Sequence, residues 1–241
     1  MATQIFSDRT KITSIAYVFL TMLLASHNVM AAESFSTEEL QAHQLPPSIH
    51  WIGVSDIEEQ FQGRPPMHVG FDVDDVALFS APVVQKVLFE NPGKRFEEIP
   101  EMYQRMNCGM EVRYSMTKQV TEKLIKLHKK RGDQIFFITA RGYTDCVDKD
   151  YGINQYLAEI YQIDNMNPVI FTNTEFGPGT KATWLMDHKI SVYYGDSDSD
   201  IQAAQNAGAL GVRVIRAANS DKQEDNRIGC YSEPVLKHSD H

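Results

Sequence analysis

Six aspartates follow two apolar runs of the chain, His68 to Phe71 and Ser191 to Tyr194. They are Asp72, Asp74, Asp75, Asp196, Asp198 and Asp200. If the two runs are neighbouring strands of a parallel sheet, these carboxylates meet at the edge where such sheets bind ligands. So much negative charge requires a cation, and hard oxygen ligands with room for water suit Mg²⁺. Each group alone is typical of a solvated turn or helix start, but together they predict a metal site.

Three further residues are candidate ligands for phosphate. Thr139 ends the apolar run Ile135 to Thr139, where its hydroxyl and the backbone N–H of Ala140 suit phosphate oxygens. Lys181 lies at the start of a predicted helix, whose positive end favours anions. A structural threonine and a solvated lysine are the simpler interpretations of each residue alone. Beside the aspartates, they indicate a phosphate ligand next to a cation.

Alternating strands and helices must position these residues. The predicted strands are His68 to Phe71, Ile135 to Thr139, Val169 to Thr172, Ser191 to Tyr194 and Gly211 to Ile215. The predicted helices are Met116 to Lys130, Asn154 to Ile160, Lys181 to His188 and Asp198 to Ala207. The alternation predicts an α/β fold, a Rossmann-like parallel sheet with helices on both faces.

Residues 83–115 interrupt this alternation after the first strand. The segment is charged, aromatic and broken by prolines, and we expect a small helical cap there. Four of its apolar side chains either line a ligand pocket or pack in a core: Phe89, Tyr103, Met106 and Met110.

The two ends of the chain differ from its middle. Residues 1–31 combine a basic start, the apolar run Ile12 to Ala25 and small residues before Ala32, which is typical of a secretory signal peptide. The run is shorter than the ~20 residues that span a bilayer, so we expect no membrane attachment after cleavage. Residues 32–66 are predicted to be a lead-in with a short helix capped by Ser55 and Glu58, residues 67–220 the core, and residues 221–241 a polar tail.

Composition excludes other classes. The 241 residues, 42% hydrophobic and 23% charged, suit a globular domain rather than a disordered or low-complexity chain. The net charge of -9 opposes binding to a nucleic-acid polymer. Cys108, Cys146 and Cys230 are too few for a disulfide framework and too widely spaced for a Cys-x-x-Cys metal site. One disulfide with a free thiol, and buried free cysteines, both remain open.

The order of these motifs resembles the haloacid-dehalogenase (HAD) superfamily, and within it the bacterial class B acid phosphatases. The likeness spans Ile49 to Ser220. The four motifs that carry it are Phe71 to Pro82, Arg131 to Arg141, Asn165 to Phe171 and Tyr194 to Ile201. Ile49 to Trp51 and Gly63 to Met67 match as well.

The resemblance implies a role for each site residue. Asp72 would be the nucleophile and a metal ligand, and Asp74 the proton donor and acceptor, with its backbone carbonyl on the metal. Asp196 would complete the metal site, and Asp200 would support that site without binding the metal itself. Thr139, the Ala140 amide and Lys181 would hold the phosphoryl oxygens.

The resemblance also implies the setting of the reaction. We expect a periplasmic homotetramer with one Mg²⁺ per subunit. It would hydrolyse small phosphomonoesters, nucleotides among them, through an aspartyl-phosphate, and pass phosphate to alcohols.

Three departures from the family pattern bear on these expectations. Val76 stands where the family usually has Thr, and Ala140 where it has Gly, so a positive φ at Ala140 would be strained. Residues 83–114 diverge most, which makes the choice of leaving group the least transferable property. Two other interpretations are a non-catalytic phosphate- or metal-binding protein on the same fold and a receiver-like phosphoacceptor domain. Export and Asp74 argue against the receiver.

Overall fold

The computed structural model describes residues 48–99, 101–144, 146, 152–172, 178–222 and 224–240. The predicted signal peptide and most of the lead-in lie outside these residues. In the described part of the chain, no helix combines the length and apolar character needed to cross a membrane.

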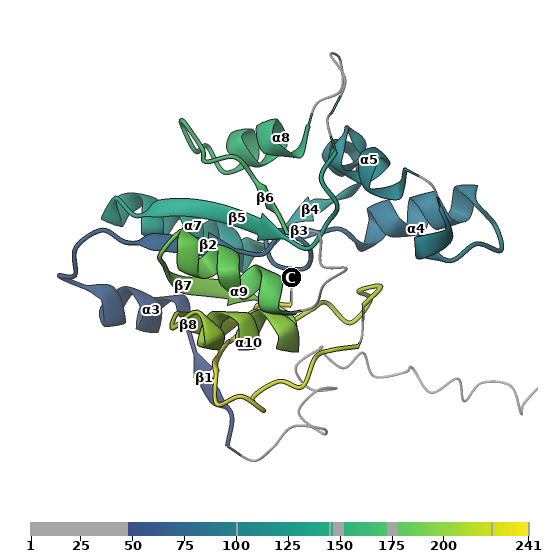
Figure 1. Cartoon of the computed structure of the whole chain (residues 1–241). Helices are drawn as coiled ribbons and strands as arrows, with labels where there is room; N and C mark the ends of the chain where they lie inside the picture. Colours follow the sequence, from purple (N-terminus) through teal and green to yellow (C-terminus); the bar gives the residue numbers. More distant parts are fainter. Residues whose placement is uncertain are drawn as a thin grey trace, which may run out of the picture. The chain divides into compact units, whose positions relative to one another are not determined.

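A seven-stranded parallel sheet forms the centre of the fold (Figure 1). Its strand order is β1-β9-β8-β7-β2-β5-β6. The strands are β1 His50–Ile52, β2 His68–Phe71, β5 Gln134–Thr139, β6 Ile170–Phe171, β7 Ile190–Gly195, β8 Leu210–Arg213 and β9 Pro234–Leu236. The predicted α/β sheet is confirmed, and the two strands that carry the aspartates, β2 and β7, are neighbours.

Helices cover both faces of this sheet, as the sequence predicts. Along β5, Ile135 and Phe137 pack in one core, whereas Phe136 and Ile138 pack in another, because successive strand residues point to opposite faces. The first core includes side chains of α3 Val54–Phe61, α7 Gln119–Arg131 and α8 Ile153–Ile160. The second includes those of α9 Pro178–Asp187 and α10 Asp198–Asn206.

The segment between β2 and α7 forms the predicted helical cap. A short antiparallel pair, β3 Leu78–Phe79 and β4 Met116–Thr117, closes its base. Between these strands lie α4 Ala81–Glu90, the 3-10 helix η1 Phe96–Glu98, α5 Met102–Asn107 and α6 Met110–Tyr114. The cap has a small apolar core of its own, which includes Val83, Val87 and Met106.

Two local predictions are wrong. The capping box was placed on Ser55, but α3 begins at Val54, and the N–H of the preceding Gly53 donates to the Asp56 carboxylate over 2.7 Å. Residues 221–241 are not merely a polar tail, because β9 lies between β1 and β8 and buries Val235 and Leu236. Three-residue strands are too short for a periodicity argument, so neither β1 nor β9 was predicted.

Candidate active site

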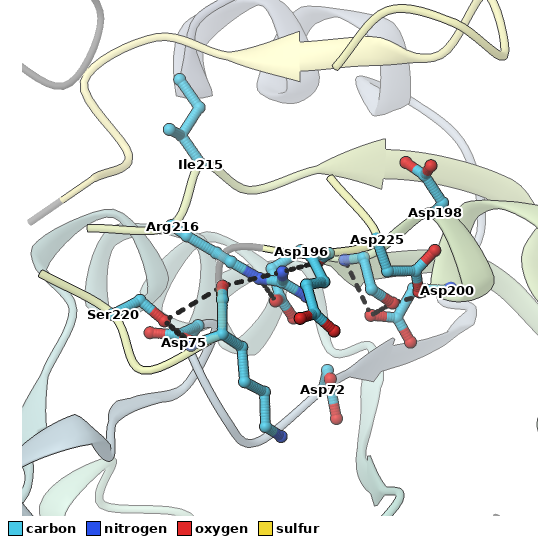
Figure 2. Close-up of polar contacts among 12 residues, drawn as sticks. Asp72, Asp75, Asp196, Asp198, Asp200, Ile215, Arg216, Ser220 and Asp225 are labelled. Carbon is cyan, nitrogen blue, oxygen red and sulfur yellow. Dashed lines mark hydrogen bonds and ion pairs between the residues drawn. The ribbon is translucent and has the colours of Figure 1, made fainter. Parts of the chain in front are cut away.

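The register of β2 and β7 brings the two acidic segments together. Phe71 pairs with Tyr194, and the backbone N–H of Asp72 donates to the Tyr194 carbonyl over 2.9 Å. Carboxylate oxygens of Asp72, Asp196 and Asp200 consequently lie within 4.8 Å of one another, and all three residues are buried (Figure 2). The predicted carboxylate cluster is present for these three residues.

The environment of Asp72 suits a cation. Burial raises the pKa of Asp72 well above its ordinary value; Lys181 opposes this, while Asp200, Asp196 and Asp74 add to it. The Lys181 ammonium lies 3.4 Å from Asp72 Oδ1, but it lies closer, at 2.6 Å, to Asp200 Oδ1. A divalent ion between Asp72 and Asp196 would relieve the repulsion that remains, so the donor set fits Mg²⁺.

Both carboxylate oxygens of Asp200 are bound by side chains, one from α9 and one from the N-cap of α10. Asp200 lies in the first turn of α10, where Ser197 is the N-cap, and its Oδ2 accepts from the Ser197 hydroxyl over 2.8 Å. Its Oδ1 accepts from Lys181. Burial alone would raise its pKa, but Lys181 and Ser197 prevail and lower the pKa of Asp200 to about 2. Asp200 therefore remains a carboxylate that holds Lys181 in place.

The close approach of α10 to β7 requires glycine at position 195. A Cβ added to Gly195 would lie 2.3 Å from the Asp200 Cβ, far inside contact distance. We expect Gly195→Ala to displace Asp200, to destabilise the protein by about 1–3 kcal/mol and to lower activity. Thermal unfolding and steady-state kinetics measure both. Gly53→Ala is the control, since its new methyl group meets nothing closer than 3.4 Å; equal behaviour of the two variants would contradict the packing argument.

Asp74 is held by an arginine that was not among the predicted site residues. Arg141 Nε donates to Asp74 Oδ2 over 3.0 Å and Nη2 donates to Oδ1 over 2.7 Å. Burial alone would raise the pKa of Asp74, but Arg141 and Lys222 hold it well below its ordinary value. Arg141 is also bound by Glu111 and Asn107 of the cap, over 2.5 and 3.2 Å. The signal for Arg141 was its place directly after β5, beside Ala140.

The predicted phosphate ligands lie at the same edge of the sheet. Thr139 is fully buried, and its Oγ1 accepts the N–H of Arg141 over 3.2 Å. Ala140 is not among the residues with positive φ, so alanine replaces the usual glycine without strain there. Lys181 lies in the first turn of α9, as predicted.

A cavity of about 820 Å³ opens at this edge. Asp72, Asp74, Ala140, Lys181 and Asp196 all line it. The cavity is large enough to hold a phosphomonoester together with its leaving group.

Three of the six aspartates lie outside the cluster of Asp72, Asp196 and Asp200: Asp74, which Arg141 holds, Asp198 and Asp75. Asp198 binds Arg213 over 2.9 Å and Arg227 over 2.7 Å, and in Figure 2 it points away from Asp72 and Asp196. The prediction that Asp198 faces the cation is therefore wrong. Asp75 accepts a hydrogen bond from Ser220 over 2.6 Å, and burial, with Asp196 nearby, raises its pKa to about 6.

Sequence reasoning also missed the basic groups behind Asp196. Arg216 Nε forms a short ion pair with Asp196 Oδ2, and Arg213 Nη1 donates to the Asp196 carbonyl over 2.8 Å. Arg213 is the last residue of β8 and Arg216 lies three residues later, and nothing in their sequence spacing distinguishes them from surface arginines.

The cysteines form one disulfide and leave one free thiol. Cys108, next to α5 of the cap, is joined to Cys146, which lies in the segment after β5. Cys230 is free and exposed. Of the two open interpretations, the structure selects the first.

Comparisons with known proteins agree with this geometry. Residues 50–223 match the family model of the HAD superfamily, subfamily IIIB (acid phosphatase). The chain is 43% identical over 206 residues to a class B acid phosphatase of Klebsiella pneumoniae, with 83% of each chain covered. It is 42% identical over 204 residues to one of a Rahnella species, again with 83% of each chain covered.

Proposed function

Since the chain belongs to the class B acid phosphatases of HAD subfamily IIIB, we propose that it is an exported, Mg²⁺-dependent enzyme that hydrolyses small phosphomonoesters, nucleotides among them. The observation that carries this proposal is the buried Asp72 carboxylate, 3.4 Å from the Lys181 ammonium in a cavity that Asp74 and Asp196 also line. A carboxylate becomes a usable nucleophile toward phosphorus when nearby positive charge offsets the charge of the ester.

In the first half of the reaction, an Asp72 oxygen forms a bond to phosphorus while the bond from phosphorus to the ester oxygen breaks. Asp74 gives its proton to the departing alcohol. In the substrate-free arrangement Arg141 and Lys222 keep Asp74 ionised, so the acid role requires Asp74 to take up a proton when the anionic ester binds beside it.

In the second half, water attacks the aspartyl-phosphate and Asp74 accepts the proton of that water. The bond between phosphorus and Asp72 breaks, inorganic phosphate leaves and the Asp72 carboxylate is restored. Lys181, the Thr139 hydroxyl and the Ala140 amide hold the phosphoryl oxygens in both halves. An alcohol that replaces water would accept the phosphoryl group, and the product would be a new ester.

Asp72, Asp196 and the backbone carbonyl of Asp74 would hold Mg²⁺, with Asp200 supporting the site through Lys181. The bound ion would neutralise charge on the transferring phosphoryl group.

The cap supplies an apolar wall for the leaving group. Val84, Leu88, Phe96 and Tyr103 line the same cavity as Asp72. The sequence left four apolar cap residues as either pocket-lining or core residues. Of these, Tyr103 lines this cavity and Met106 lines a smaller one beside it. Met110 packs against the cap core, and Phe89 is 82% exposed. An apolar, aromatic wall suits nucleosides and other aromatic alcohols as leaving groups.

The periplasmic location and the homotetramer belong to the same proposal. Their support is the N-terminal sequence pattern and the family, respectively, since the signal peptide lies outside the described residues.

Metal removal is the direct test. We expect the purified protein to hydrolyse p-nitrophenyl phosphate and to lose at least about 100-fold of this activity after dialysis against EDTA, because the repulsion around Asp72 returns. Added Mg²⁺ should restore the activity, and a series with Mn²⁺, Zn²⁺ and Ca²⁺ compares the other ions. Full activity in EDTA would contradict the metal site. Binding of inorganic phosphate without turnover would favour the non-catalytic alternative.

A further inference from the structure

Lys222 lines both cavities beside the catalytic aspartates. It lies on the segment between β8 and β9, and its side chain is exposed to solvent. The larger cavity contains Asp72 and Lys181. The smaller one, of about 140 Å³, is lined by Asp74, Ser80, Tyr103 and Arg141 among others, on the cap side.

The other cations that line these cavities are already paired. Lys181 binds Asp72 and Asp200, Arg216 binds Asp196, and Arg141 binds Asp74 and Glu111. Among the cavity-lining cations of the described residues, Lys222 is the one whose side chain makes no hydrogen bond or ion pair. It is therefore available to a ligand.

The backbone of Lys222 is held firmly although its side chain is not. Its N–H donates to Ser220 Oγ over 3.2 Å, and its carbonyl accepts from Arg216 Nη1 over 2.9 Å. Ser220 in turn donates to Asp75. The segment is thus tied to the same residues that build the site, which positions Lys222 at the cavity.

The smaller cavity places Lys222 on the side of the leaving group, because its lining includes Asp74 and cap residues but neither Asp72 nor Lys181. In keeping with this, Asp74 raises the pKa of Lys222 most, ahead of Asp196 and Asp72. Asp74 is the proposed proton donor to the departing alcohol, whereas Lys181 lies beside the nucleophile. The two lysines therefore serve different parts of the substrate.

We propose that Lys222 determines specificity by binding an anionic group on the leaving alcohol, such as a carboxylate or a second phosphate close to the ester oxygen. This inference rests on the proposed phosphatase activity. Asp221, Glu224 and Asp225 line the same cavity, so an anionic alcohol is repelled there unless Lys222 offsets them. Esters of neutral alcohols do not need this contact.

Two nearly isosteric esters, glycerol 3-phosphate and 3-phosphoglycerate, test the inference. The leaving alcohol of the first carries a neutral hydroxymethyl group where that of the second carries a carboxylate. We expect Lys222→Gln to lower kcat/KM for 3-phosphoglycerate about tenfold more than that for glycerol 3-phosphate. Lys222 also lowers the pKa of Asp74, but a change in proton transfer affects both esters alike and cancels in this ratio. Lys222→Glu should penalise 3-phosphoglycerate relative to glycerol 3-phosphate even more than Lys222→Gln does. Lys222→Arg keeps the positive charge and should hydrolyse the two esters in the wild-type ratio. The inhibition constant of inorganic phosphate should stay unchanged in Lys222→Gln.

Lys237→Gln, at an exposed lysine after β9, controls for the loss of one positive charge and should behave like the wild type. Equal losses for both esters would overturn the inference, since Lys222 would then act on the transferred phosphoryl group or on Asp74 instead of the leaving alcohol. No loss for either ester would overturn it as well, while leaving the phosphatase proposal intact. A wild type that hydrolyses neither these esters nor p-nitrophenyl phosphate would overturn both.

Discussion

Asp72→Asn is expected to lower the turnover of p-nitrophenyl phosphate by a factor on the order of 10⁴ or more, since the amide cannot attack phosphorus. The replacement is nearly isosteric. The hydrogen bond from the Val73 N–H to Asp72 Oδ1, 2.8 Å long, survives if the amide oxygen takes that position. Steady-state kinetics in saturating Mg²⁺ measures the loss.

A second readout separates attack by Asp72 from simple metal binding. Wild-type protein quenched in acid during turnover of a ³²P-labelled ester should retain label that hydroxylamine releases, as expected of an acyl phosphate. Asp72→Asn should retain none. Asp187→Asn, at an exposed position at the end of α9, is the matched control for one lost carboxylate and should label normally. Labelling of Asp72→Asn at the wild-type level would refute the nucleophile assignment.

The same substitution should stabilise the metal-free protein. The pKa of Asp72 is raised by burial and by Asp200, Asp196 and Asp74, against the opposing effect of Lys181. The folded state therefore binds this proton more tightly than the unfolded state does, and the corresponding stability is lost as pH rises through the raised pKa. Asparagine carries no such charge, so its gain in Tm in EDTA should grow from acidic to neutral pH. A buried charge that costs stability is expected of a functional site.

The sequence predicts those site residues whose position depends only on where a strand ends or a helix begins. Asp72 directly follows β2 and Asp196 lies just after Gly195, the last residue of β7, so strand adjacency alone brings them together. The position of Lys181 can be predicted in the same way, because this residue lies in the first turn of α9. These three positions need only the element boundaries and the sheet order.

Partners from distant segments could not be predicted in this way. Asp198 lies two residues from both Asp196 and Asp200, so its position in the sequence does not set it apart from them. Arg213 and Arg227, which follow it by 15 and 29 residues, nevertheless bind its carboxylate. Arg141 binds Asp74 across 67 residues. Which arginine reaches which carboxylate depends on how β8, the cap and the segment before β9 pack, and that packing leaves no periodic trace in the sequence.

The contacts between the cap and the rest of the site could not be predicted from the sequence either. The helices of the cap were expected, yet its link to the catalytic edge runs through Asn107, whose side-chain amide donates to the Gly142 carbonyl over 3.1 Å and whose oxygen accepts from Arg141. The neighbouring Cys108 adds the covalent bond to Cys146. The spacing of three cysteines left their pairing open, and only the fold decides it.

Removing this disulfide is expected to have the second large effect. The bridge joins residues 38 positions apart, and the loss of such a constraint on the unfolded chain costs about 4 kcal/mol in the chain-entropy account. We expect the double variant Cys108→Ser, Cys146→Ser to show a lower free energy of unfolding by this order in urea titrations. Cys230→Ser, at the exposed free thiol, is the matched control and should unfold like the wild type.

The double variant should also lose activity while it is still folded, because the bridge holds Asn107 against Arg141 and Arg141 holds Asp74. Freed of the bridge, the cap and the segment after β5 can separate, and the contacts of Arg141 with its two cap partners, Asn107 and Glu111, are then weakened. The expected kinetic signature is a fall in kcat together with a rise in KM, since Arg141 positions Asp74, the proposed proton donor, and also lines the smaller cavity. Treatment of the wild type with a thiol reductant should reproduce this signature, and Cys230→Ser should respond to reductant as the wild type does. A double variant with lowered stability but unchanged kcat and KM at a temperature where it is fully folded would show that the bridge stabilises the fold without positioning Arg141.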